Sequence, residues 1–154
     1  MGEEMRKVFA IIFSLLVLGC SDEENIPTKF DSPDHEKIYN VIKKLTDTIS
    51  TYDKEGILSV FAENATILSS MQNRNKKVVT KAEYSEILSS WKLKHWKETG
   101  LKSQLIGVKG ISIEGGKAKA TVTIKFYGNG FSGMDTQKHL LVKENGQWLI
   151  GQLN

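Results

Sequence analysis

The sequence predicts an α+β fold in which a strongly curved antiparallel sheet wraps around three N-terminal helices. Residues 101–153 are typical of four strands joined by short turns, and apolar residues recur at helical spacing before them. A sheet of this size has an apolar face that helices must cover. The 154 residues are 40% hydrophobic and 25% charged, which is the composition of one globular domain.

Turn residues and alternating side chains define the four expected strands. Asn145-Gly146 lies between two apolar runs and is a strong hairpin signal, and residues 114–117 (Glu-Gly-Gly-Lys) give a second one. Residues 118–127 alternate between apolar and polar side chains, so we expect one buried face. The opposite face is a candidate homodimer surface that carries Lys119, Thr121 and Thr123.

The first two expected helices lie between residues 34 and 62. Ser32 or Asp34 can cap the first helix. Its apolar residues follow one face, at Ile38, Ile42, Leu45, Ile49 and Tyr52. Asp53 then caps a short second helix that runs to about residue 62, and residues 64–68 form a short strand.

A polar loop over residues 71–77 leads into the third expected helix. This helix begins at a capping box formed by Thr80 and Glu83, and Gly100 ends it. The spacing places one stripe on its inner side, made of Tyr84, Ile87, Leu88, Trp91 and His95. The same spacing directs Lys92, Lys94 and Lys97 away from that stripe.

The first nineteen residues predict a secretory signal peptide. Arg6-Lys7 precede an apolar run over residues 8–18, which is too short to cross a bilayer. Translation can start at Met1 or at Met5. Residues 17–20 (Val-Leu-Gly-Cys) resemble the lipobox of bacterial lipoproteins. That resemblance implies that Cys20 becomes the acylated first residue and anchors the chain in a membrane.

A general secretion signal that happens to end at a cysteine is the alternative. Against it, Cys20 is the only cysteine, so it has no disulfide partner in an oxidising compartment. Residues 20–34 then form the lipidated cysteine and a flexible tether that contains both prolines, and residues 35–154 form the domain. The interpretation also places His35 in the tether.

The residues after Cys20 bear on localisation in the cell envelope. Ser21, rather than aspartate, follows the cysteine, which disfavours retention in the inner membrane, so we expect the outer membrane or the cell surface. The acidic residues 22–24 resemble an export tag of surface lipoproteins. They can equally be a solvated spacer.

Two segments are distinctive: residues 52–65, around the second helix, and residues 143–150, which end in Gly-Gln-Trp-Leu-Ile. Together with the order of elements, they resemble the SnoaL-like branch of the nuclear transport factor 2-like superfamily. The resemblance implies a cone with a cavity at its open end and pairing through the outer sheet face. Some members are isomerases, dehydratases or epoxide hydrolases that use a cavity carboxylate or histidine as general base.

Few residues of this chain fit such chemistry. Asp53 and His95 are the candidate catalytic bases, although Asp53 also suits a helix cap and His95 suits a helix C-terminus. The candidate ligand-binding residues are Tyr52, Trp91, Tyr127 and His139. Aromatic residues at helical spacing are also typical of a core.

Several other classes of site are not supported by the sequence. Three scattered histidines without neighbouring cysteines or paired carboxylates do not predict a metal site. Residues 128–133 match G-x-G-x-x-G, but a strand follows them instead of the helix that a dinucleotide fingerprint needs, so no cofactor is expected. A net charge of +3 with scattered lysines does not indicate nucleic-acid binding.

We therefore expect a non-catalytic cell-envelope lipoprotein whose cone domain binds a small apolar ligand or a protein partner. The motivation is the lipid anchor together with the lack of paired acid and base residues. The alternative is a small isomerase, dehydratase or hydrolase that uses Asp53 or His95 with Tyr127. The alternative requires that these side chains meet inside one cavity, because proton transfer needs hydrogen-bond reach.

Overall fold

The computed structural model describes Pro27 and residues 29–154. The predicted signal peptide, Cys20 and half of the predicted tether (residues 21–26 and 28) lie outside the described residues. Among the described residues, no helix has the length and apolar character needed to span a bilayer.

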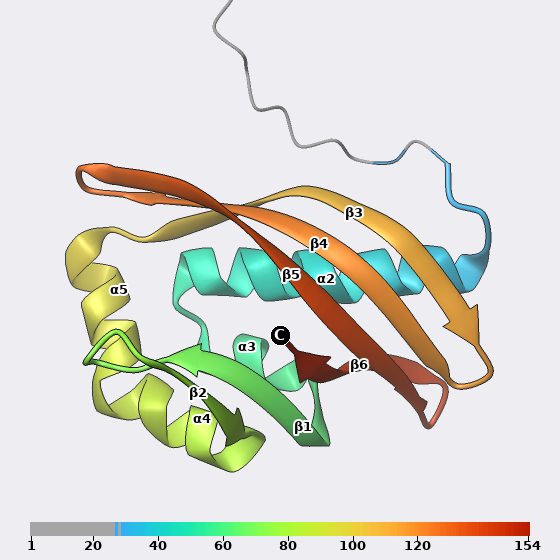
Figure 1. The fold of residues 1–154 in the computed structure, drawn as a ribbon, viewed down its shortest axis with the longest axis horizontal. Coiled ribbons are helices and arrows are strands. Elements are labelled where there is room, and N and C mark those ends of the chain that lie inside the picture. Colours follow the sequence, from blue (N-terminus) through green and yellow to red (C-terminus); the bar gives the residue numbers. More distant parts are fainter. Residues whose placement is uncertain (1–26, 28) are drawn as a thin grey trace, which may run out of the picture.

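A six-stranded, strongly curved sheet organises the fold, with strand order β2-β1-β6-β5-β4-β3. Its long strands arch over helix α2, while the short helices lie toward β1 and β2 (Figure 1). All neighbours are antiparallel except β1 and β6, which are parallel. The strand bounds are β1 Phe61–Ser70, β2 Lys76–Thr80, β3 Lys102–Glu114, β4 Lys117–Gly128, β5 Phe131–Glu144 and β6 Gln147–Leu153.

The four predicted C-terminal strands are confirmed, together with their turns. Asn145 and Gly146 both have positive φ angles, of 51° and 78°, as the turn of this hairpin requires. The alternation of β4 is also as expected, because Ala118, Ala120, Val122 and Ile124 are buried while Lys119 and Thr121 are exposed. Residues 128–133 form the β4–β5 hairpin and open no helix.

Helix α2, Pro33–Thr51, is capped by Ser32, whose side chain accepts a hydrogen bond from the backbone N–H of His35. The helix therefore begins two residues before the expected domain boundary. The placement of His35 in the tether is wrong, because proline suits the first turn of a helix and Ser32 completes the cap. Ile38, Ile42 and Leu45 of this helix lie in the core, as predicted.

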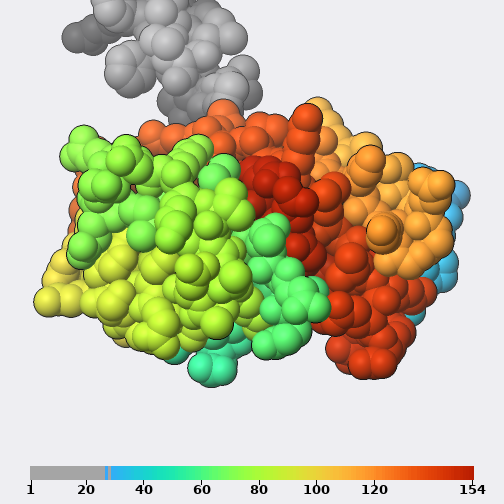
Figure 2. Space-filling view, turned by 60° about the horizontal axis from the view of Figure 1, so that its bottom comes forward, coloured from blue at the N-terminus to red at the C-terminus, as the bar shows by residue number. Residues whose placement is uncertain are grey.

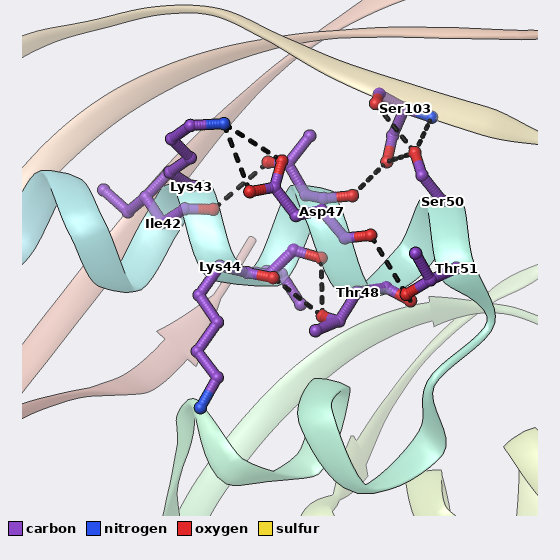
Figure 3. Close-up of polar contacts among 10 residues, drawn as sticks. Ile42, Lys43, Lys44, Asp47, Thr48, Ser50, Thr51 and Ser103 are labelled. Carbon is purple, nitrogen blue, oxygen red and sulfur yellow. Dashed lines mark hydrogen bonds and ion pairs between the residues drawn. The ribbon is translucent and has the colours of Figure 1, made fainter.

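Serine contacts fix the C-terminal end of α2 against β3 (Figure 3). The Ser50 hydroxyl donates to the carbonyl of Ser103 at 2.9 Å and accepts from its N–H at 2.8 Å. The Ser103 hydroxyl donates to the carbonyl of Thr46 at 2.6 Å. These bonds hold one wall of the interior in a fixed position.

Helix α3 is Lys54–Ser59, and the predicted cap at Asp53 is confirmed. The Asp53 carboxylate accepts from the N–H of Gly56 at 3.0 Å. The helix ends earlier than expected, because Phe61 already belongs to β1 and pairs with Ile150 of β6. Strand β2 was not predicted, because the expected loop covered its first two residues and residues 78–79 were assigned to no element. Its five residues bury only Val79, so they carry too little alternation to indicate a strand.

The third predicted helix has three parts: α4 Lys81–Ile87, the π-helical turn η1 Leu88–Lys92, and α5 Leu93–Thr99. The predicted capping box at Thr80 and Glu83 is confirmed, and Gly100 caps the end. In the π turn, the N–H of Leu93 donates to the carbonyl of Leu88, five residues earlier. A π turn places one extra residue in a helical turn, so the faces after it shift by one position.

This shift makes the predicted inner stripe wrong beyond Leu88. Lys92 is buried, although it was expected to point away from the stripe. Trp91 and His95, which were expected on the inner side, lie toward the surface: Trp91 is half-buried and His95 is exposed. Trp96, one residue after His95, packs against the core instead.

Candidate functional site

An interior cavity of about 370 Å³ lies between helix α2, strand β1, the α4–η1–α5 segment and the inner face of β4 and β5. Its apolar wall includes Leu45, Ile49, Phe61, Ile67, Ile124 and Phe126. Its polar wall includes Ser69, Lys92, Asp135 and Gln137. A volume of this size accommodates a small organic ligand, and an apolar wall with a few polar groups is typical of such sites.

Lys92 supplies the buried positive charge of this cavity. The π turn directs its side chain inward, where only 6% of the residue is exposed. Its ammonium group donates to the Ser69 hydroxyl and to the Ser70 carbonyl, each at 2.9 Å. Both acceptors belong to β1, so the lysine connects the helical wall to the sheet.

Three aromatic rings surround the Lys92 ammonium. Its Nζ lies 5.2 Å from the ring centroid of Trp91, 5.7 Å from that of Trp96 and 5.8 Å from that of Tyr84. Ring faces attract a cation at these distances. Burial lowers the pKa of Lys92 from 10.5 to about 8, because removing the charged form from water is unfavourable.

A hydrogen-bonded row runs along the inner face of β5. Gln137 Nε2 donates to the Asp135 carboxylate at 2.9 Å, and Gln137 Oε1 lies 3.0 Å from Nε2 of His139. A carboxylate only accepts, so the amide nitrogen of Gln137 faces Asp135 and its oxygen faces His139. His139 Nε2 must therefore carry the proton that joins this row.

His139 itself lies in the sealed core. It is fully buried opposite Ala120 and Leu153, and it does not line the interior cavity. Its Nδ1 has no hydrogen-bond partner among the described residues. Burial lowers the pKa of His139 from 6.5 to about 4, so the imidazole is neutral at physiological pH.

The sequence-based catalytic candidates lie outside the interior cavity. Asp53 is exposed at the start of α3, and His95 is exposed on α5. Tyr127 is 41% exposed on the outer face of β4. None of the three lines the interior cavity, so the arrangement that the enzymatic alternative required is not present.

The remaining aromatic candidates also lie away from the interior cavity. Tyr52 caps the end of α2, with Lys102 Nζ 4.9 Å from its ring centroid. Trp91 and His95 line a separate outer depression of about 770 Å³, with their ring centroids 6.2 Å apart. Lys92 and Trp96 line the outer depression and also line the interior cavity, so these two side chains lie between the two spaces.

Sequence reasoning missed Lys92, Asp135 and Gln137 as cavity residues. No local pattern in residues 88–92 signals the π turn, so helical spacing placed Lys92 on the wrong face. The two residues on β5 could have been predicted from the alternation of side chains along a strand. If Leu141 is taken as buried, then Asp135, Gln137 and His139 lie on the same face of β5. Within residues 29–154, no cluster of metal-ligating side chains is present.

Comparison with known proteins identifies the fold alone. No family model and no curated protein matches the chain. Among solved structures, a nuclear transport factor 2-like protein with a cystatin-like fold from Novosphingobium aromaticivorans has a TM-score of 0.64 at 13% identity, covering 94% of this chain and 84% of its own. A similar protein of unknown function from Shewanella oneidensis has a TM-score of 0.61 at 15% identity, covering 77% and 94%.

A ketosteroid isomerase candidate from Shewanella frigidimarina is also similar, with a TM-score of 0.61 at 21% identity over 80% of this chain and 94% of its own. These structures share the curved sheet and the helices that it encloses, whatever their functions. The described chain therefore has the nuclear transport factor 2-like, or cystatin-like, cone fold.

Proposed function

We propose that this protein is a cell-envelope lipoprotein whose cone domain binds a small, largely apolar ligand in its interior cavity. The cavity is the observation that supports this proposal. About 370 Å³ of space is bounded by the core side chains Phe61, Ile67 and Ile124 together with polar side chains that include Lys92 and Gln137. The lipobox-like residues 17–20 support attachment of the domain to a membrane through Cys20.

Binding is tested with octan-1-ol, an apolar probe without charge. The chain carrying Cys20→Ser is titrated by calorimetry, so that no detergent competes for the probe. Leu153 lines the cavity and Leu149 does not, although both are half-buried on β6. We expect Leu153→Trp to fill the cavity and abolish binding, while Leu149→Trp binds as the parent does. Equal binding by both variants contradicts the proposed site.

Attachment is tested separately from ligand binding. Cells that express the full chain are labelled with radioactive palmitate. We expect label on the protein and none on the Cys20→Ser variant, because the thiol is the acylated group. Label retained by the variant contradicts a lipid on Cys20. Fractionation of the labelled cells then distinguishes the outer membrane or cell surface from the inner membrane.

A catalytic function is the second candidate, and one observation favours it. Asp135 lines the cavity, unlike Asp53 and His95, and one of the similar structures is a ketosteroid isomerase candidate. A cavity carboxylate is a suitable general base for moving a proton next to a ketone. We would expect turnover of a β,γ-unsaturated ketosteroid that Asp135→Asn abolishes. No turnover by the parent rejects this candidate.

A homodimer through the outer sheet face is a further part of the proposal. That face carries exposed Thr121 and Tyr127, and a depression of about 780 Å³ near the start of β4 is lined by Lys119, Leu140 and Val142. Light scattering after size exclusion measures the mass of the Cys20→Ser chain. We expect a measured mass of twice the chain mass, as for a dimer. The Leu140→Glu variant places a charge in the depression and should have the mass of a single chain.

A further inference from the structure

We propose that Lys92 binds the carboxylate of the ligand, so that the cavity takes monocarboxylates with an apolar body. This inference rests on the proposed function and specifies its ligand class. Three observations support it: the unused hydrogen-bond capacity of the lysine, the absence of a neighbouring counter-charge, and the division of the cavity wall into polar and apolar parts.

The Lys92 ammonium has one more N–H group than the number of hydrogen bonds it makes to the described residues. An ammonium carries three N–H groups. Two of them reach the Ser69 hydroxyl and the Ser70 carbonyl, and the only other contacts of Nζ in the described part of the chain are with aromatic rings. The third N–H is therefore available to an acceptor supplied by a ligand.

The charge of Lys92 is not neutralised by the protein. Among residues 29–154, no carboxylate lies within 4.0 Å of its Nζ, whereas several other lysines have such partners. Buried charges are normally paired, because an unpaired ion loses its hydration without compensation. A ligand carboxylate supplies the missing counter-charge beside a lysine that is itself only 6% exposed.

The rest of the lining determines what the ligand carries besides its carboxylate. Ile49, Ile124 and Phe126 offer only apolar surface to its body. Asp135 and Lys76 also line the cavity, and Asp135 is the acidic side chain among its lining residues. Lys92 and Lys76 contribute two positive charges to the lining and Asp135 contributes one negative charge, so the net side-chain charge is +1, which a monoanion balances and a dianion exceeds.

The test compares octanoate with octan-1-ol, which share an apolar chain and differ in charge. Their dissociation constants are measured by calorimetry at pH 7 on the Cys20→Ser chain and on its Lys92→Met variant. We expect Lys92→Met to weaken octanoate binding by roughly 10- to 100-fold, the usual loss for a hydrogen bond to a charged group. Octan-1-ol should change by less than about threefold, because methionine keeps the apolar stem.

Matched variants separate Lys92 from other positive charges. Lys76→Met removes an exposed lysine of the same cavity, and Arg74→Ala removes the arginine of the outer depression. Neither should weaken octanoate binding as Lys92→Met does, whereas Lys92→Arg should retain part of it. If Arg74→Ala weakens octanoate binding as much as Lys92→Met does, the carboxylate binds in the outer depression instead. That result would overturn the assignment to Lys92.

The outcomes distinguish this inference from the proposed function. If octan-1-ol binds and Lys92→Met leaves the octanoate affinity unchanged, the cavity binds ligands but Lys92 does not select carboxylates. If neither probe binds, both proposals are wrong. A folded Lys92→Met variant is confirmed by circular dichroism, and unchanged octan-1-ol binding by that variant shows independently that its cavity is intact.

Discussion

Two buried basic side chains occupy different regions of this cone and meet different conditions there. Lys92, on the helical wall, reaches the cavity and keeps one N–H without a partner in the described chain. His139, on β5, is fully buried in the core and is joined to Gln137. Burial lowers the pKa of both. A shifted pKa therefore does not by itself indicate a site, and access to the cavity distinguishes the two.

The difference follows from how each region is built. The extended strand alternates its side chains, so His139 shares the inner face of β5 with Leu141 and is covered by the core. The helical wall has a π turn, which brings Lys92 to the inner side at the level of the cavity. The sheet gives His139 a structural environment, and the irregular helix gives Lys92 an accessible one.

The largest predicted effect concerns His139 and acid. Its pKa is about 4 in the folded protein and 6.5 when unfolded, so between these values the unfolded chain binds more protons. Stability must then fall as the pH falls through this window. From pH 7 to pH 4.5 this one group removes about 2.5 kcal/mol from the free energy of unfolding.

Urea unfolding at both pH values measures this effect, and His139→Leu is the matched variant. Whatever the free energy of unfolding of the variant at pH 7, its loss on acidification should be smaller than that of the parent by about 2.5 kcal/mol. Asp34 and Glu83 also have lowered pKa values, through Lys143 and through the Thr80 backbone, and their acid loss is common to both proteins. Equal acid losses would show that His139 is not sealed.

Lys92 is predicted to respond to alkali instead. Its pKa is about 8 in the folded protein and 10.5 when unfolded, so the buried charge costs stability below pH 8. That cost decreases as the pH rises through 8 toward 10.5, because the folded protein loses its proton first. From pH 7 to pH 9 the free energy of unfolding should rise by about 1 kcal/mol relative to Lys92→Met.

This measurement also sharpens the contrast with His139. Replacing a buried ion by an apolar residue of similar size is often neutral or stabilising. We therefore expect Lys92→Met to be at least as stable as the parent at pH 7 while it loses octanoate. Stability that falls in this variant, without any change in octanoate binding, would make Lys92 a structural residue like His139.

The contrast between regular strands and the irregular helical wall also explains how much of the structure the sequence could predict. Hairpin turns and the two-residue alternation of β4 are local signals, so the C-terminal strands were predicted correctly. Strand β2 was missed because its partner β1 supplies the pairing that its own five residues do not indicate. The cavity lysine was missed because one extra residue in a helical turn shifts every later face, and no residue type marks that insertion.

The smallest predicted effect concerns Asp53, which the sequence offered as a catalytic base and the structure shows as a helix cap. Its carboxylate accepts from the N–H of Gly56, and it does not line the cavity. Asp53→Ala should lower the free energy of unfolding by about 1 kcal/mol, whereas Asp53→Asn keeps a capping oxygen and should change it little. Neither variant should alter octanoate affinity at pH 7. Reduced octanoate affinity in both variants would mean that Asp53 affects ligand binding in the cavity. Asp53 would then not be a helix cap alone.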